Sequence, residues 1–236
     1  REIAPRASVI GLPRPDVENF EKTRNTALNA LMRFLEQYYD AVLRSDADEF
    51  VLVDPAKHTS IGAAISATDA DACFVVGFNV FAESDDLPVD PQQKVSEVRS
   101  LCAISDTYSK AVIARNGLFI GFHGARDKTR FEASRMAVLD GIYLAHLKFA
   151  RTLEVDGTIA GETAYFSTEK ARSRSVDLKR QELPEVDGDT ALNDAFIHFT
   201  EGGLAPWRKR RPGVYVVPRK EMDATFRLPA RFRGLF

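Results

Sequence analysis

Two acidic residues separated by one position, Asp46 and Asp48, are the part of this sequence best suited to chemistry. They lie in the stretch Asp-Ala-Asp-Glu-Phe over residues 46–50, just after the short apolar run 41–43. In extended backbone, side chains at positions i and i+2 point to the same face, so the two carboxylates would converge. Paired carboxylate oxygens suit a hard divalent cation such as Mg²⁺ or Mn²⁺, which also binds phosphate oxygens. The alternative is an acidic turn that faces solvent.

The apolar pattern around this pair predicts an α/β fold. The expected elements are a helix, two strands, a second helix and a third strand, over residues 17–38, 41–43, 50–53, 60–67 and 72–81. Such alternation is typical of a sheet covered by helices, whose ligands bind beyond the carboxyl ends of its strands. Asp46 and Asp48 follow an expected strand and therefore fall at such an end.

The rest of the chain is expected to extend this core. The later elements are β-like stretches at 95–104, 110–115 and 118–122, in an antiparallel extension, and helices near 164–181 and 191–200. A loop rich in Asp and Pro is expected over residues 83–93. We therefore expect a catalytic core over residues 1–150 and a helical, irregular and basic extension of the same domain over 151–236.

Composition excludes some classes of function. The chain has 236 residues with 44% hydrophobic and 28% charged residues, as in soluble globular proteins. The formal net charge of -2 argues against a nucleic-acid partner held by a basic surface. Both cysteines, Cys73 and Cys102, have apolar neighbours and are expected to be reduced core thiols in a cytoplasmic protein. No apolar run reaches the roughly twenty residues that span a bilayer.

Several short segments of the chain follow the order found in one known enzyme fold. They are Arg24, Ala27-Leu28-Asn29, Tyr39-Asp40-Ala41-Val42-Leu43, Asp46-Ala47-Asp48-Glu49-Phe50, Lys110-Ala111-Val112-Ile113-Ala114-Arg115, Gly121-Phe122-His123 and Leu144-Ala145-His146-Leu147-Lys148-Phe149. These segments resemble the core of the GT-A glycosyltransferases, nearest to the family 2-like and family 92-like groups. The resemblance fades after residue 150, although Leu228-Pro229-Ala230-Arg231-Phe232 looks like a common C-terminal ending.

The resemblance implies a Rossmann-like GT-A mixed sheet flanked by helices. It also implies an enzyme that moves a sugar from a nucleotide-diphosphate donor to the hydroxyl of a glycan, lipid or polysaccharide precursor. A GT-A domain normally starts with two β/α units that hold the base and ribose, and this sequence shows neither. We expect residues 8–12 to form already the third strand, with the first units upstream of Arg1; a degenerate or rearranged domain is the alternative.

Three side chains are assigned to the metal by this resemblance. Asp48 would bind Mn²⁺ or Mg²⁺ directly, and Asp46 would contact the ribose or the water shell of the metal. His123 would be a third group on the metal side, because a neutral imidazole is an acceptable ligand for Mn²⁺. The other interpretation of His123 is a packing residue at the end of the expected strand 118–122.

Cationic residues in the matched segments are assigned to the diphosphate. Lys110, Arg115 and Lys148 would act as donors to its oxygens, although each alone also fits a solvated surface charge. His146 is expected one turn before a helical continuation, where it would orient Lys148 or the acceptor. A core role for His146 is the alternative.

An inverting transfer needs a carboxylate that takes the proton of the acceptor hydroxyl. Asp85 and Asp86, after the expected strand 72–81, are the candidates, and Asp106 is a weaker one. A flexible acidic loop is the other interpretation of Asp85 and Asp86, and a retaining mechanism stays open.

The basic C-terminal run Trp207-Arg208-Lys209-Arg210-Arg211 could contact an anionic membrane surface or a lipid-linked acceptor. A basic tail packed on its own domain is the alternative. Two further classes of function stay open for the whole chain: a noncatalytic module that binds a nucleotide-sugar or a glycan, and a metal-dependent phosphohydrolase or nuclease.

Overall fold

The computed structural model of the protein describes residues 20–83, 85–87, 89–116, 118–121, 124–126, 135–150, 182–206 and 214–236. The strand expected over residues 8–12, the helix expected near 164–181, the basic run 207–211 and the candidate ligand His123 lie outside these described residues. Within the described ranges, no helix is both long and apolar enough to cross a membrane.

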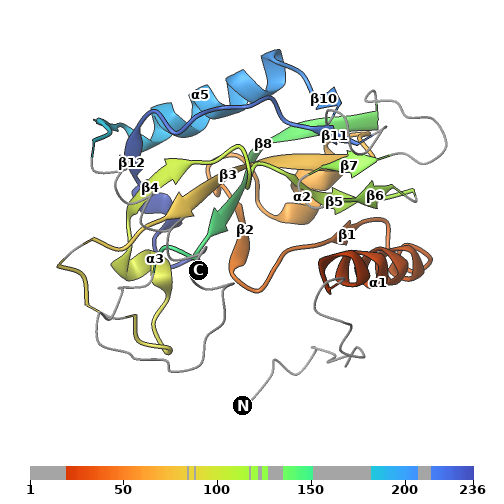
Figure 1. The fold of residues 1–236 in the computed structure, drawn as a ribbon, viewed down its shortest axis with the longest axis horizontal. Coiled ribbons are helices and arrows are strands. Elements are labelled where there is room, and N and C mark those ends of the chain that lie inside the picture. Colours follow the sequence, from red (N-terminus) through yellow and green to blue (C-terminus); the bar gives the residue numbers. More distant parts are fainter. Residues whose placement is uncertain are drawn as a thin grey trace.

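The fold is α/β with a mixed open sheet and few helices (Figure 1). In chain order the elements are α1 (Phe20–Leu35), β1 (Val42–Leu43), β2 (Glu49–Val53), α2 (Ile61–Ser66), β3 (Ala72–Val80), α3 (Val95–Val98), β4 (Leu101–Ile104), β5 (Ala111–Ala114), β6 (Phe119–Ile120), β7 (Ala125–Arg126), β8 (Met136–His146), β9 (Glu185–Val186), α5 (Gly188–Glu201), β10 (Ala205–Pro206), β11 (Tyr215–Val216), β12 (Thr225–Arg227) and the 3-10 helix η3 (Ala230–Phe232).

Strand β3 is the centre of the main sheet. Along one edge it pairs antiparallel with β5 through residues 72–74 and with β4 through residues 78–80. Along the other edge it pairs parallel with β8, which in turn pairs antiparallel with β2. All nine residues of β3 are buried, in keeping with its nearly continuous apolar sequence. The sheet runs β1-β5-β3-β4-β12-β9, with β8 and β2 beyond β3, while β10-β11-β7-β6 form a second sheet.

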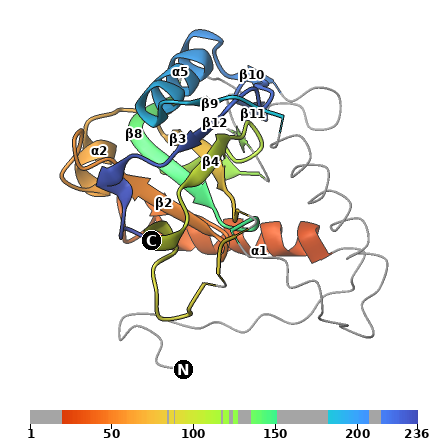
Figure 2. The ribbon, with the colours of Figure 1, turned by 90° about the vertical axis from the view of Figure 1, so that its left-hand side faces the viewer.

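Alternating residues of β3 pack into two cores on opposite faces of the sheet. Phe74, Val76 and Phe78 join the cluster that contains Leu192, Ala195 and Phe199 of α5. Cys73 and Val75 join a second cluster with Ala64 of α2 and with Ile142 and Leu144 of β8. Helices α5 and α2 therefore cover opposite faces, and α5 and α1 lie at opposite sides of the molecule (Figures 1 and 2).

Most of the expected elements are confirmed. The expected helices at 17–38, 60–67 and 191–200 correspond to α1, α2 and α5, and the expected strands at 41–43, 50–53 and 72–81 correspond to β1, β2 and β3. The oxygen of Ser60 accepts the Ala63 N–H at 3.1 Å and so caps α2. Strands β4 and β5 extend β3 in the expected antiparallel sense, but β6 belongs to the second sheet.

Residues 95–98 form the short helix α3 instead of the start of a strand, so that expectation is wrong. The N–H and hydroxyl of Ser96 both donate to the carbonyl of Phe236, at 2.9 and 2.8 Å. These hydrogen bonds to the last residue of the chain thus stabilise a helical turn at the position where a strand was expected.

His146 ends the eleven-residue strand β8 and is followed by a turn at residues 148–149; the helical continuation expected one turn further on falls outside the described residues. The dipeptide Asp140-Gly141 resembles a turn in the sequence. In the structure Gly141 has φ +70°, and the β3–β8 register shifts beside it, so the dipeptide is a bulge inside the strand. A Cβ at Gly141 would lie 2.9 Å from Lys57, which also favours glycine there.

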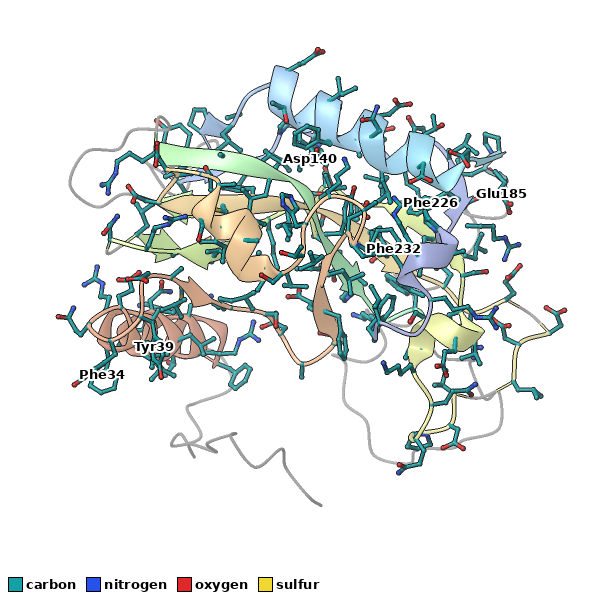
Figure 3. The ribbon with its side chains drawn as sticks, turned by 180° about the vertical axis from the view of Figure 1, so that it is seen from behind. Phe34, Tyr39, Asp140, Glu185, Phe226 and Phe232 are labelled. Atoms are coloured by element: carbon teal, nitrogen blue, oxygen red, sulfur yellow. The ribbon has the colours of Figure 1, made fainter. Side chains whose placement is uncertain are left out.

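The C-terminal part completes the core of the sheet. Strand β12 lies between β4 and β9, and Phe226 and Phe232 are almost wholly buried. Phe226 packs edge-on against Phe78, and Phe232 packs edge-on against Tyr143, on the side of the molecule shown in Figure 3. The sequence predicted only irregular structure here.

An ion pair between the buried Asp54 and the partly exposed Arg231 fixes the C-terminal residues to the end of β2. Arg231 donates Nε to Oδ1 of Asp54 at 2.8 Å and Nη2 to Oδ2 at 2.9 Å, and it also contacts Asp189 of α5. Burial alone would raise the pKa of Asp54, but the hydrogen bonds from Arg231 and from the Ala56 N–H outweigh it. The pKa of Asp54 is therefore held below its usual value.

We expect Arg231→Met to destabilise the protein by about 3–5 kcal/mol at neutral pH, because it leaves the Asp54 carboxylate buried without its cation. In the wild type the lowered pKa stabilises the fold above the unfolded-state pKa, and that stability is lost as the pH falls through the folded-state pKa. In the variant, burial raises the pKa of Asp54, so the deficit should shrink as the pH falls from about 7 to about 4.

Urea unfolding of both proteins over this pH range measures the effect. Arg233→Met is the matched control, since Arg233 is exposed and belongs to the same segment. A deficit for Arg231→Met that equals that of the control, or that does not change with pH, would contradict this account.

Candidate functional site

A row of three polar residues crosses the main sheet on the face that carries α2. Glu49 of β2 is the register partner of His146 in β8, and His146 is the register partner of Asn79 in β3. Register partners point to the same face of a sheet. Since β3 and β8 are parallel, Asn79 and His146 lie near their carboxyl ends, which is where open α/β sheets bind ligands.

The acidic segment is a turn, so the expectation of extended backbone with converging side chains is corrected. The N–H of Glu49 donates to the carbonyl of Asp46 at 3.1 Å, and the N–H of Asp46 donates to Oε2 of Glu49 at 3.0 Å. This reciprocal pair of hydrogen bonds closes the turn. As a result, Asp46 and Asp48 have different partners.

Asp46 lies among cations. Its Oδ1 accepts from Nη1 of Arg24 at 3.0 Å, and its Oδ2 is 4.0 Å from Nζ of Lys110. The same ammonium donates to Oε1 of Glu49 at 2.6 Å. The side chains of Lys110 and Glu49 are only 10% and 2% exposed, whereas those of Arg24 and Asp46 are 29% and 31% exposed. The turn thus contains one buried ion pair and one partly exposed ion pair.

Asp48 faces the imidazole of His146. Its Oδ2 is 3.4 Å from Nε2, and its carboxylate is half-exposed. On the other side of the ring, Nδ1 is 2.8 Å from Oδ1 of Asn79, so with this amide orientation Nδ1 carries the hydrogen and Nε2 presents a lone pair. Burial lowers the pKa of His146 to about 4; Lys148 and Lys110 act in the same direction, and Asp48 opposes them.

The lowered pKa of His146 favours the neutral imidazole in its contact with Asp48. With the Asn79 amide in this orientation, the Nε2 lone pair faces a carboxylate oxygen, and a proton donor or a cation between these two acceptors would be favourable. With the amide turned over, Nδ1 accepts from Asn79 and Nε2–H donates to Asp48.

Tyr108 covers His146. The two rings are stacked, with centroids 3.6 Å apart and planes at 17°. This packing requires the loop after β4 to cross β3 at Gly77, where a Cβ would lie 2.1 Å from the Tyr108 carbonyl oxygen. Only glycine permits this approach, and Ser109 Oγ accepts the Gly77 N–H at 2.8 Å.

A small polar pocket lies beside the turn, on the Asp46 side. It is lined by residues of α1, of the segment between β1 and β2, of β5 and of β6, namely Arg24, Arg44, Ser45, Asp46, Lys110, Ala111, Ile120 and Gly121. Helix α1 holds one wall through Asn29, whose amide donates to the carbonyl of Ile120 at 2.9 Å and accepts its N–H at 3.1 Å. Arg44 donates to the same carbonyl at 3.1 Å and also contacts Asn25.

The other predicted site residues lie in different places. Arg115 follows the far end of β5 from Lys110 and donates to the carbonyls of Ile65 and Thr68 at the end of α2. Lys148 follows β8 and is close enough to His146 for its charge to lower the pKa of that ring. The structure thus brings Asp46, Asp48, Lys110, His146 and Lys148 into one region and gives Arg115 a local role.

The candidate bases lie in two loops. Asp86 Oδ2 accepts the Glu83 N–H at 2.6 Å and is 3.4 Å from Nε of Arg99, so this carboxylate stabilises its own loop. Asp85 is exposed. Asp106 lies in the loop that carries Tyr108 and accepts a hydrogen bond from Thr107 at 3.3 Å.

Several residues of the region had no predicted role. Arg24 and Glu49 belong to the matched segments, but nothing in the sequence paired them with Asp46. Asn79 is the polar residue in the otherwise apolar strand β3, and that interruption was a usable signal. For Tyr108 and Arg44 we find no sequence signal, because their positions depend on how separate loops cross the sheet.

Comparison of the chain with known protein families, with characterised proteins and with solved structures finds no match. The resemblance of the short segments therefore stays a hypothesis about fold and function. Among the residues that the structure describes, no group of three or more His, Cys, Asp and Glu side chains is arranged to hold a metal ion.

We expect Lys110→Met to destabilise the protein by about 3–5 kcal/mol, because it strands the buried Glu49 carboxylate. Replacing both partners, as Glu49→Gln with Lys110→Met, should recover most of that loss, since no buried charge is then left unpaired. Denaturant unfolding of the wild type, the single variants and the double variant measures the coupling.

Lys57→Met is the matched control. Lys57 pairs with Asp140 at a similar distance, 2.5 Å, but the two side chains are 36% and 46% exposed. Its replacement should cost at most about 1 kcal/mol. If both lysine variants lose the same stability, or if the double variant is no more stable than Lys110→Met, burial does not decide the strength of these pairs.

Proposed function

We propose that this protein is a divalent-metal-dependent glycosyltransferase that takes a sugar from a nucleotide-diphosphate donor and transfers it to a hydroxyl acceptor. The observation that carries the proposal is the pairing, at the carboxyl ends of β3 and β8, of the half-exposed Asp48 carboxylate with the neutral His146. The small polar pocket on the Asp46 side of the turn is lined by Asp46 and by the cations Arg24, Arg44 and Lys110. The GT-A resemblance of the same segments supports the assignment.

The residues present fit a cation that has few protein ligands. Mg²⁺ and, by the same chemistry, Mn²⁺ are commonly held by one or two carboxylates together with substrate phosphates and water. Asp48 and His146 would hold the metal, and Asp46 is close to them in sequence but is paired with Arg24. When bound, the metal would neutralise charge on the leaving diphosphate.

The protein side chains would contribute binding and orientation. Arg24 of α1, Arg44 after β1 and Lys110 before β5 would offer charge-assisted donors to phosphate oxygens. Asn79 and Tyr108 fix the ring of His146, so that Nε2 stays directed at Asp48. For the acceptor hydroxyl, the exposed Asp85 is a better base candidate than Asp86, whose carboxylate is engaged by Glu83 and Arg99.

The partners follow from this proposal. The donor is a nucleotide-sugar and the acceptor is a glycan or lipid-linked hydroxyl, in a cytoplasmic protein whose basic C-terminal run would reach the inner membrane face. Two alternative functions must be separated from glycosyl transfer by experiment: a metal-dependent phosphohydrolase and a noncatalytic binding module.

We expect Mn²⁺ to be required for tight binding of a nucleoside diphosphate, and Asp48→Asn to abolish that requirement together with the tight binding. The neutral amide keeps the size of the carboxylate but loses the charge that holds the cation. Calorimetric titration of a panel of nucleoside diphosphates with Mn²⁺ and with EDTA measures both effects.

Asp223→Asn is the control, because Asp223 is 70% exposed and pairs with Lys220 outside the site. Equal affinity with Mn²⁺ and with EDTA would refute the metal role. Slow, metal-dependent release of sugar from a nucleotide-sugar would support the transferase, rapid cleavage of simple phosphoesters would support the hydrolase, and binding without turnover would support the module.

A further inference from the structure

Helix α1 packs on the sheet with polar side chains. Asn25 and Asn29 are each only 5% exposed, whereas Phe20 and Phe34 of the same helix are 45% and 57% exposed. An amphipathic helix normally buries its apolar side, and a buried amide is unfavourable unless it is hydrogen-bonded. The two buried asparagines therefore need a specific explanation.

Asn29 fixes the backbone of Ile120 in β6. Its Nδ2 donates to the Ile120 carbonyl at 2.9 Å, and its Oδ1 accepts the Ile120 N–H at 3.1 Å. The same Nδ2 donates to the carbonyl of Asn25, one helical turn earlier, at 2.8 Å. A carbonyl oxygen has two lone pairs, and that of Ile120 also accepts Nη1 of Arg44 at 3.1 Å.

Asn25 holds the other nitrogen of the Arg44 fork. Its Oδ1 accepts Nη2 of Arg44, whereas its own buried Nδ2 has no hydrogen-bond partner within the described part of the chain. The amide cannot be turned over to satisfy this nitrogen, because a guanidinium has only donors and would then face the NH₂ group. Asn25 thus keeps its oxygen on Arg44 although this leaves a buried donor unsatisfied, which is unfavourable for stability.

The arginine held in this way lines the small polar pocket, together with Arg24 and Lys110. The guanidinium of Arg24 is bonded to Asp46, and the ammonium of Lys110 is bonded to Glu49. The acceptors that fix Arg44 are a carbonyl and an amide, so these two hydrogen bonds orient its guanidinium without cancelling its charge. A planar guanidinium in a fixed orientation suits a phosphate-type oxyanion, which it can bind with two parallel hydrogen bonds.

We propose that Asn25 is a positioning residue that holds Arg44 for a phosphate-type oxyanion, and that this oxyanion binds in the pocket without a divalent cation. The inference deepens the proposed function, on which the choice of phosphate as the anion rests. Asn25 acts through Arg44 and need not contact the anion itself. Asn29 supports the same arrangement by fixing the Ile120 carbonyl, and no covalent bond is formed or broken.

The test measures the affinity of the whole chain for inorganic phosphate in EDTA, by calorimetry, with chloride at equal ionic strength as the reference. We expect Arg44→Met to weaken phosphate binding about tenfold or more, because it removes a charged hydrogen-bond donor. Arg33→Met is the control, since Arg33 is an exposed cation of the same helix and does not line the pocket. It should change the affinity by less than about twofold.

Asn25→Leu separates positioning from stability. Leucine has the same branched shape, leaves the charge of the pocket unchanged and removes the unsatisfied donor, so the variant should unfold in urea close to the wild type. Phosphate should still bind about threefold or more weakly, because Arg44 has lost one of the two hydrogen bonds that orient it. In the Arg44→Met background the same change should leave phosphate affinity unaltered. Asn25→Ala replaces Asn25→Leu if the latter does not fold.

Unchanged phosphate affinity in Asn25→Leu, or an equal loss with and without Arg44, overturns the positioning role. A wild type that binds no phosphate in EDTA overturns the oxyanion site, and the proposed function still stands if Mn²⁺ supports diphosphate binding. Metal-free phosphate binding that depends on Arg44 and Asn25, in a protein whose diphosphate affinity is equal with Mn²⁺ and with EDTA, supports the inference and removes the metal from the proposed function.

Discussion

The buried carboxylate of Glu49 is the point at which the sheet and the candidate site depend on each other. Glu49 begins β2 opposite His146, accepts Lys110 with one oxygen and accepts the N–H of Asp46 with the other. A buried carboxylate without these partners would cost several kcal/mol, so the position of Lys110 and the shape of the turn are fixed together. Asp48 is directed at His146 as a consequence, because it occupies the turn between two anchored positions.

The centre of the fold was predictable because its signals are local. The continuous apolar run of β3, the Ser60 cap and the amphipathic pattern of α1 and α5 each act within about ten residues. The failures involve distant partners. Strand β8 was hidden by the Asp140-Gly141 bulge, which lies inside a strand that pairs with β3 before and after the bulge and with β2 after it. Strand β12 depends on β4 and β9 in the same way.

The same difference between local signals and distant partners applies to the candidate site. Asp46 and Asp48 were found from their spacing, yet the physical reason given, converging side chains in extended backbone, does not hold in a turn. The partner of each carboxylate comes from far away in the sequence: Arg24 from α1, Lys110 from the position just before β5 and His146 from the end of β8. Spacing can identify residues that bear charge, but the pairing of those charges depends on the sheet register.

Burial explains why acceptor groups face each other at this site without disrupting the fold. His146 is stacked under Tyr108 and bonded to Asn79, so its ring is held with Nε2 directed at Asp48. Asp48 is half-exposed and keeps water around its carboxylate, which lowers the cost of the unfavourable contact. Asn79 and Tyr108 thus fix the orientation of the imidazole, and Nε2 is directed at the half-exposed Asp48 of the turn. With the hydrogen on Nδ1, a proton donor or a cation between Nε2 and the carboxylate would make this arrangement favourable; with the hydrogen on Nε2, the imidazole itself is the donor.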